Sequence, residues 1–174
     1  QSQTIEFPNT NNGAIWADLD VKGMTIRIIN VHMQTTSFDR MRSKAAQARG
    51  EQDEEQERAI YLGYSDNFRE NTVRRAGQAE QISSLINATE YPLIVCGDFN
   101  DSPISYTHRV VGEGLNDAFV ESGNGFGISY NQNHFYFRID NILLSKNLKS
   151  YRCTVDNTIK SSDHYPIWCY VAEK

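Results

Sequence analysis

The sequence lacks the features that mark disulfide-rich, zinc-binding and membrane-spanning proteins. It has only three cysteines, an odd number without C-x-x-C spacing, so it predicts neither a disulfide framework nor a zinc site. No run approaches the roughly 20 consecutive apolar residues that a transmembrane helix needs. Basic residues are also too few to dominate the charge. The formal net charge of −5 disfavours a chain that holds nucleic acid by bulk electrostatics.

What is present suits a globular domain. The chain has 174 residues, of which 39% are hydrophobic and 22% charged, and it has no internal repeat or linker. A chain of this size buries about two thirds of its unfolded surface, enough for a core of its own. We therefore expect residues 1–174 to belong to one domain. The chain begins with Gln1, without an initiator methionine or a signal-like segment. We interpret it as a piece of a longer polypeptide, whose location in the cell the sequence does not indicate.

Strand and helix patterns alternate along the chain. Good helix formers dominate from about residue 37 to residue 88, and we expect two helices there, broken near residues 63–67. The acidic run at residues 51–57 is interpreted as a solvated helical face. A short helix is expected at 105–111. Strands are expected at 14–20, 25–32, 93–97, 138–145, 150–156 and 166–171, with a hairpin turn at Gly23 between the first two.

Two of the predicted strands end in polar side chains. Residues two apart share one face of a strand, so the apolar face of the second strand ends in His32. In the same way, the apolar face of the strand that starts at residue 93 continues into Asp98 and Asn100. Alone, Asp98 and Asn100 are equally explained as turn residues, and His32 alone favours a structural interpretation.

Two later strands begin with polar side chains. Asp140 comes at the start of one apolar run, and Asp163 and His164 directly precede the last one. If these strands run opposite to the earlier two, all the polar ends meet at one edge of the sheet system. A carboxylate inside an apolar strand needs a partner, which favours function for Asp140. Asp163 could instead be a loop residue and His164 a half-buried structural histidine. Together the residues fit hydrolytic chemistry with a hard divalent cation.

Four short motifs carry these residues in a fixed order along the chain. They are Asn30-Val31-His32, Gly97-Asp98-Phe99-Asn100, Arg138-Ile139-Asp140-Asn141-Ile142-Leu143 and Ser162-Asp163-His164-Tyr165-Pro166. Together they resemble the endonuclease/exonuclease/phosphatase superfamily, whose members share the DNase I-like fold. The resemblance implies an α+β protein of the four-layer α/β/β/α sandwich type, with mixed β-sheets and flanking helices.

The resemblance also implies a reaction and a cofactor. Members of this superfamily hydrolyse phosphoester bonds with a divalent cation, usually Mg²⁺, and Mn²⁺ or Ca²⁺ would be alternatives. Asp163 and Asp98 would be metal ligands. The principal ligand of the family is a glutamate that would lie upstream, on a strand that this chain lacks before Phe7. We therefore expect the chain to be the C-terminal portion of the domain, and to bind Mg²⁺ poorly and act weakly when isolated.

Carried over residue by residue, the resemblance gives each polar residue a role. Asp98 would orient or activate the attacking water, and Asn100 would hold that water and a phosphate oxygen. His164, oriented by Asp140, would be the base or a phosphate contact. His32 would stabilise the phosphoryl group or the leaving oxygen.

The incomplete domain leads to an expectation about assembly. Apolar faces such as those of Ile26 with Ile28, and of Ile94 with Cys96, would lack part of their partner sheet. We expect homodimerisation or repacking to cover them.

Three function classes follow from these observations. The first is a metal-dependent phosphoesterase, with a nucleic acid, a lipid headgroup or a small phosphoester as its substrate. The second is a catalytically inactive relative that serves as a binding module. The third, a metal-free serine or cysteine hydrolase, is disfavoured because the chain has no G-x-S-x-G motif.

Overall fold

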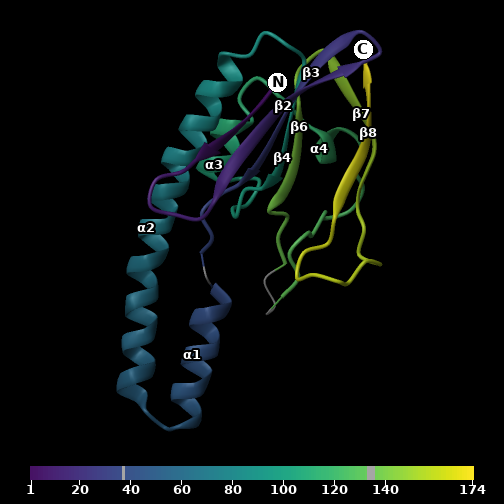
Figure 1. Cartoon of the computed structure of the whole chain (residues 1–174). Helices are drawn as coiled ribbons and strands as arrows, with labels where there is room; N and C mark the ends of the chain where they lie inside the picture. Colours follow the sequence, from purple (N-terminus) through teal and green to yellow (C-terminus); the bar gives the residue numbers. More distant parts are fainter. Residues whose placement is uncertain (37, 133–135) are drawn as a thin grey trace.

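The structure, a computed structural model, describes residues 1–36, 38–132 and 136–174 (Figure 1). The first residue of the predicted helical segment, position 37, lies outside these ranges. The helices are α1 (Phe38–Gly50), α2 (Glu54–Asn87), α3 (Tyr106–Val111) and α4 (Ala118–Ser122). The strands are β1 (Ser2–Glu6), β2 (Gly13–Val21), β3 (Met24–His32), β4 (Leu93–Asp98), β5 (Asn116–Asp117), β6 (Asp140–Leu144), β7 (Leu148–Val155) and β8 (Ile167–Glu173). Within the described ranges, none of the helices combines the length and apolarity needed to cross a membrane.

A mixed sheet forms the centre of the molecule. Its strand order is β1-β2-β3-β4-β6-β5, with β3 and β4 parallel and the other neighbours antiparallel. The predicted hairpin between β2 and β3 is confirmed, with Lys22 and Gly23 both at positive φ, as a tight two-residue turn requires. The sequence analysis missed β1, because this edge strand is mostly exposed and has little apolar patterning.

The connection from β3 to β4 is a helical hairpin of α1 and α2 (Figure 1). The predicted break near residues 63–67 is wrong, because α2 runs through it without interruption. The break lies earlier, where Gln52 has a positive φ and the Asp53 side chain accepts a hydrogen bond from the Gln56 N–H at 2.8 Å. A capping carboxylate stabilises a new helix start, whereas a single internal glycine costs only about 1 kcal/mol. The acidic run is thus solvent-exposed, but it spans the break.

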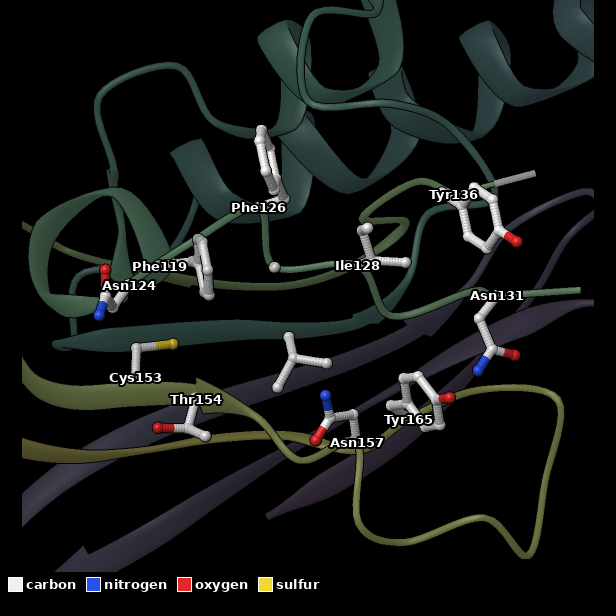
Figure 2. A pocket seen from close by; sticks show the side chains of 12 residues that line it. Phe119, Asn124, Phe126, Ile128, Asn131, Tyr136, Cys153, Thr154, Asn157 and Tyr165 are labelled. Carbon is white, nitrogen blue, oxygen red and sulfur yellow. The ribbon is translucent and has the colours of Figure 1, made fainter. Parts of the chain in front are cut away.

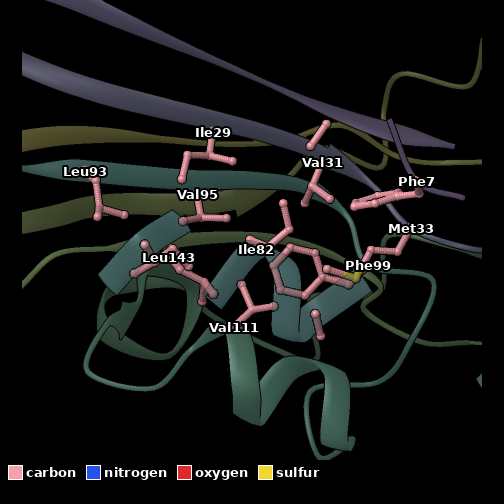
Figure 3. Packing of buried hydrophobic residues seen from close by; sticks show 13 residues of the cluster. Phe7, Ile29, Val31, Met33, Ile82, Leu93, Val95, Phe99, Val111 and Leu143 are labelled. Atoms are coloured by element: carbon pink, nitrogen blue, oxygen red, sulfur yellow. The ribbon is translucent and has the colours of Figure 1, made fainter. Parts of the chain in front are cut away.

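The main core lies between one face of the sheet and the helices α2 and α3 (Figure 3). All buried residues of α2 come from its C-terminal half: Asn71, Arg75, Gln78, Ala79, Ile82 and Ile86. On the sheet side, the buried residues include Ile29, Val31, Leu93, Val95 and Leu143. The N-terminal half of α2 projects past the sheet beside α1 (Figure 1). One half of this helix therefore anchors it to the core, and the other half extends away.

A second, two-stranded sheet of β7 and β8 covers the opposite face of the central sheet. The contact between the two sheets joins Ile94, Cys96, Ile142 and Leu144 to Leu148, Cys153, Ile167, Cys169 and Val171. The described residues thus form three layers: helices, the mixed sheet and the small sheet. This arrangement is an α+β fold with flanking helices, as the sequence predicted.

Part of the central sheet's second face stays open to solvent. Ile94 and Cys96 pack against the small sheet and Ile26 is buried, whereas Ile28 is half-buried. The most open area lies beside these β3 residues on β2, where Ile15 is 48% exposed and Leu19, which pairs with Ile26, is 44% exposed. Homodimerisation through this face stays a prediction.

Candidate active site

Three of the predicted site residues lie in one row across three neighbouring strands. His32 of β3 pairs in register with Asp98 of β4, and Asp98 pairs with Asp140 of β6. Because β3 and β4 are parallel and β6 is antiparallel to them, two strands end and one begins at this edge. The expected meeting of the polar strand ends is therefore present for these three residues.

The glycine before Asp98 lets β4 approach β3 closely. A Cβ atom on Gly97 would lie 2.0 Å from the carbonyl oxygen of Val31, and Gly97 has a φ of +132°. Both observations require glycine at this position. On the other side of Asp98, the fully buried Phe99 anchors the chain in the core. Asp98 is thus held between a tight backbone contact and a buried aromatic ring.

Asp98 in turn fixes Asn100. The Asp98 carboxylate accepts hydrogen bonds from the backbone N–H of Asn100 at 2.7 Å and from its side-chain amide at 2.9 Å. The same amide donates to the Met33 carbonyl at 3.0 Å. Asn100 has a φ of 50°, a conformation that asparagine adopts more readily than most residues. Asp98 and Asn100 thus form a turn, and this turn holds Asn100 beside Asp98; their catalytic roles stay predictions.

His164 and Asp140 form a hydrogen-bonded dyad. His164 Nδ1 lies 2.8 Å from Asp140 Oδ2, and both side chains are half-buried. The hydrogen bond to Asp140 raises the pKa of His164 above its ordinary value, although burial opposes this. A carboxylate at Nδ1 makes that nitrogen the proton donor, so that Nε2 is the one that can accept a proton. The ring of Tyr130 packs edge-on against His164, with centroids 5.1 Å apart.

Ser129 links the two members of this dyad, and the sequence analysis missed it. Its side chain is fully buried, and its hydroxyl accepts the backbone N–H groups of Ile139 and Asp140, each at 3.0 Å. Its backbone carbonyl accepts the N–H of Tyr165, the neighbour of His164, at 2.7 Å. One residue therefore positions both segments of the dyad. No sequence pattern marks a single serine in a glycine-rich and asparagine-rich loop.

Arg138 supports the same strand from the other side. Its guanidinium pairs with Asp117 at 2.6 Å and donates to the Asn141 side chain at 2.7 Å. Asp117 also lies 3.1 Å from His108 Nε2. Burial raises the pKa of Asp117, but the hydrogen bonds from His108 and Arg138 outweigh it and lower the value to about 2. His108 is thus a structural residue, and Arg138 has a structural partner within its own motif.

Asp98, Asp140 and His164 are close enough to share a cation. One ligand atom from each lies within 4.8 Å of the others. Burial and the neighbouring Asp140 carboxylate raise the pKa of Asp98 to about 6. A half-buried carboxylate next to a second one fits a divalent cation, which would compensate the negative charge.

Asp163 and His32 lie at the margin of this cluster. Asp163 is exposed and accepts a hydrogen bond from Ser162 Oγ at 3.1 Å, and its carboxylate is not among the three clustered ligand groups. His32 Nε2 is 3.7 Å from Asp98 Oδ2, with a side chain that is 59% exposed. Both residues therefore remain accessible next to the cluster, and their assigned roles stay predictions.

Two cavities flank the site. The cavity beside Tyr165 has a volume of about 630 Å³ and is lined by aromatic and amide side chains, among them Phe126, Asn131 and Tyr136 (Figure 2). The other has a volume of about 520 Å³ and includes Asn100 itself in its wall. Of these two cavities, the second shares a wall residue with the candidate site.

Comparisons with solved structures show the same fold in proteins of distant sequence. D. rerio TDP2 complexed with a single-strand DNA product is 18% identical, with a TM-score of 0.66, and the match covers 99% of this chain and 67% of that one. The human Nocturnin catalytic domain with bound sulfate is 18% identical, with a TM-score of 0.59, covering 100% and 59%. The Bacteroides thetaiotaomicron mannosyl-6-phosphatase Bt3783 is 17% identical, with a TM-score of 0.54, covering 92% and 57%.

The chain spans about two thirds or less of the length of these structures. No curated protein matches it by sequence. Residues 7–164, however, match the model of the Endonuclease/Exonuclease/phosphatase family, and this range includes the first three motifs and Ser162, Asp163 and His164 of the fourth. The chain therefore belongs to the endonuclease/exonuclease/phosphatase family and has its DNase I-like fold.

Proposed function

We propose that this chain supplies the catalytic dyad and the water-positioning residues of a divalent-metal-dependent phosphoesterase. The observation that carries the proposal is the hydrogen bond of 2.8 Å between His164 and Asp140, next to Asp98 in the same row of the sheet. An oriented imidazole beside two carboxylates suits the hydrolysis of an ester by water. A binding module has no need of an imidazole oriented in this way.

Each residue has a defined task in this proposal. His164 Nε2, which is directed by the Asp140 contact at Nδ1, takes a proton from water or contacts the phosphate. Asp98 orients the attacking water. Asn100 lies beside it to hold that water and a phosphate oxygen, and it contacts the phosphate by exchanging one of its two amide hydrogen bonds, which go to Asp98 and Met33. His32, exposed beside Asp98, stabilises the phosphoryl group or the leaving oxygen. These groups place donors around the position where negative charge develops.

Asp98 and Asp163 are the carboxylates that we assign to the cation, with Mg²⁺ as the first choice and Mn²⁺ or Ca²⁺ as alternatives. Asp140, which clusters with Asp98 and His164, is assigned to the orientation of His164 instead. When bound, such a cation neutralises charge on the phosphoryl oxygens and lowers the pKa of a bound water. Asp98 contributes the more enclosed carboxylate and Asp163 the exposed one. With two carboxylates, one of them exposed, we expect this chain alone to bind Mg²⁺ weakly.

The proposed phosphoesterase function is compatible with several classes of substrate. Among proteins of this fold, the D. rerio TDP2 structure contains a single-strand DNA product and the B. thetaiotaomicron protein is a mannosyl-6-phosphatase. Nucleic acid, a lipid headgroup and a small phosphoester therefore all stay candidates. The net charge of −5 does not favour nucleic acid.

The test is an assay of phosphodiester and phosphomonoester hydrolysis, with and without Mg²⁺. It uses this chain and, in parallel, the product of the complete coding sequence. Asp140→Asn keeps the size of the side chain but removes the charge that orients His164, so we expect a loss of 10²- to 10⁴-fold in kcat, about the contribution of a general base. His164→Ala should lose at least as much.

The matched control is Asp156→Asn. Asp156, like Asp140, is an aspartate whose carboxylate accepts a side-chain hydrogen bond. Its partner, however, is Thr158 of the same turn and not a histidine. Its substitution should leave hydrolysis unchanged. Equal activity of Asp140→Asn and Asp156→Asn would contradict the dyad. A folded, Mg²⁺-binding protein without any phosphoesterase activity would favour the binding-module alternative.

A further inference from the structure

Beside Asn100, the projecting half of α2 forms a cavity of about 520 Å³ with the segments that follow β3 and β4 and precede β6. We call it the α2 cavity. Its wall includes Tyr64 and Phe68 from α2, Phe137 and Ile139 from the segment before β6, and Asn100 from the candidate site. A volume of this size lies within the range of small-molecule binding pockets. The cavity places the exposed half of this helix next to Asn100.

The cavity wall is aromatic, and two of its rings are exposed. Phe68 is 46% exposed and Phe137 is 41% exposed, although they belong to segments far apart in the sequence. Tyr64 and Phe68 pack against each other with ring centroids 6.1 Å apart. Exposed aromatic rings that gather around a concave site mark a place where an apolar group binds.

The charged groups in the wall are already paired. Arg75 is 2% exposed, and its guanidinium lies 3.4 Å from Asp101 and donates to the Gln34 carbonyl at 3.0 Å. Asp101 also accepts a hydrogen bond from Thr107 at 2.9 Å. These two residues hold the end of the cavity rigid and neutralise each other. Among the described residues of the wall, the one cation is thus already paired, and the cavity suits an uncharged group better than a second phosphate or a carboxylate.

Asn100 connects this cavity to the proposed chemistry. Its amide is fixed by Asp98 and Met33, so the wall of the cavity and the phosphate-binding position share one residue. A group attached directly to the phosphate at Asn100 is within reach of Phe68 and Phe137. The cavity beside Tyr165 has no such shared residue among those in its wall.

We infer that the α2 cavity is a substrate subsite for an uncharged aromatic or compact apolar group esterified to the scissile phosphate. This inference rests on the proposed phosphoesterase function and adds the substrate class. Removal of one ring from water contributes roughly 1.5–3 kcal/mol, and 1.4 kcal/mol corresponds to a factor of ten. Substrates with such a group should therefore be preferred about tenfold or more over small alkyl esters.

The test compares dimethyl phosphate with methyl 1-naphthylmethyl phosphate, with hydrolysis followed by ³¹P NMR in the product of the complete coding sequence. The naphthyl ester should have at least a tenfold higher kcat/KM. Phe68→Ala should remove this preference and leave dimethyl phosphate unaffected. Ser65→Leu, which fills the cavity from α2, should do the same without deleting a ring.

The control is Phe126→Ala. Phe126 is 89% exposed and lines the other cavity, so its loss should not change the preference. A second measurement does not depend on turnover: binding of 1-naphthylmethylphosphonate by calorimetry, which Phe68→Ala should weaken about tenfold and Phe126→Ala should not.

The outcomes separate the two proposals. If both esters are hydrolysed equally well and the phosphonate binds Phe68→Ala as tightly as the parent protein, the subsite is wrong while the phosphoesterase stands. If neither ester is hydrolysed but the phosphonate binds through Phe68, the subsite stands and the catalytic proposal fails. Loss of preference on Phe126→Ala instead would move the subsite to the cavity beside Tyr165.

Discussion

Ser129 offers the sharpest test of how the dyad is built. Substitution by alanine removes the hydroxyl that accepts the backbone N–H groups of Ile139 and Asp140 at 3.0 Å each. The site is fully enclosed, because Ser129 is 0% exposed, and the new methyl group replaces the oxygen without admitting water. Each buried N–H left without a partner costs about 1–3 kcal/mol. With two such N–H groups, we expect Ser129→Ala to lower the free energy of unfolding by about 2–6 kcal/mol.

The same substitution should also affect the dyad itself. The pKa of His164 is raised mainly by its hydrogen bond to Asp140, and Asp140 loses one of its backbone anchors in the variant. A less firmly held carboxylate weakens that bond, so the pKa of His164 should move down toward its ordinary value. Titration of the imidazole C–H resonances by NMR in metal-free protein measures this. A purely structural role of Ser129 would lower stability without this shift.

Urea unfolding followed by tryptophan fluorescence gives the stability change, and Ser84→Ala is the matched control. Ser84 lies on α2, and its hydroxyl donates to the Glu80 carbonyl at 2.9 Å instead of accepting backbone N–H groups. Its loss leaves no donor unpaired and should change stability by less than about 0.5 kcal/mol. The reasoning is refuted if Ser129→Ala costs no more than Ser84→Ala, or if the His164 titration is the same in the variant and the parent.

Three further substitutions test the support around the site. Gly97→Ala should destabilise the protein by about 3 kcal/mol or more in urea unfolding, because its Cβ would lie 2.0 Å from the Val31 carbonyl oxygen at a strained φ; a change below 1 kcal/mol would contradict the close approach. Phe99→Ala should cost about 3–5 kcal/mol, since the ring is fully buried, and thermal unfolding checks this. Asp117→Asn should cost about 3–5 kcal/mol at pH 7, because Arg138 loses its charged partner. Since the folded-state pKa of Asp117 is about 2 and its ordinary value is 3.8, this stabilisation is present above pH 4 and lost as the pH falls toward 2; unfolding curves of parent and variant should converge there.

The sequence predicted correctly those features that depend on side-chain alternation along a strand and on strand direction. The polar ends of the strands predicted that His32, Asp98 and Asp140 would meet, and their register places them in one row. Prediction was also reliable for β4, whose apolar run is buried on one face by helices and partly covered on the other. In both cases the local sequence pattern is enough for the prediction, because the alternation of side chains within each strand shows which of its residues share a face.

Two kinds of interaction explain the features that the sequence did not predict. They are helix-capping hydrogen bonds and contacts between residues far apart in the sequence. The helix break was misplaced because the capping contact of Asp53 outweighs the weak effect of Gly63. Ser129 escaped notice because its role depends on two segments that come together only in the fold. The same applies to the α2 cavity, whose aromatic wall comes from positions 64–68 and 137.

The division of α2 into an anchored and a projecting half has a consequence for how such proteins diversify. Every buried residue of the helix belongs to the C-terminal half, so insertions, deletions or recombination within the hairpin tip leave the core largely unaffected. The α2 residues that line the α2 cavity can therefore change without disturbing the row of His32, Asp98 and Asp140, which other elements hold. The α1–α2 hairpin could then differ between related proteins with different substrates while the rest of the fold stays the same. Transplanting the hairpin between homologues would then transfer substrate preference in a single step.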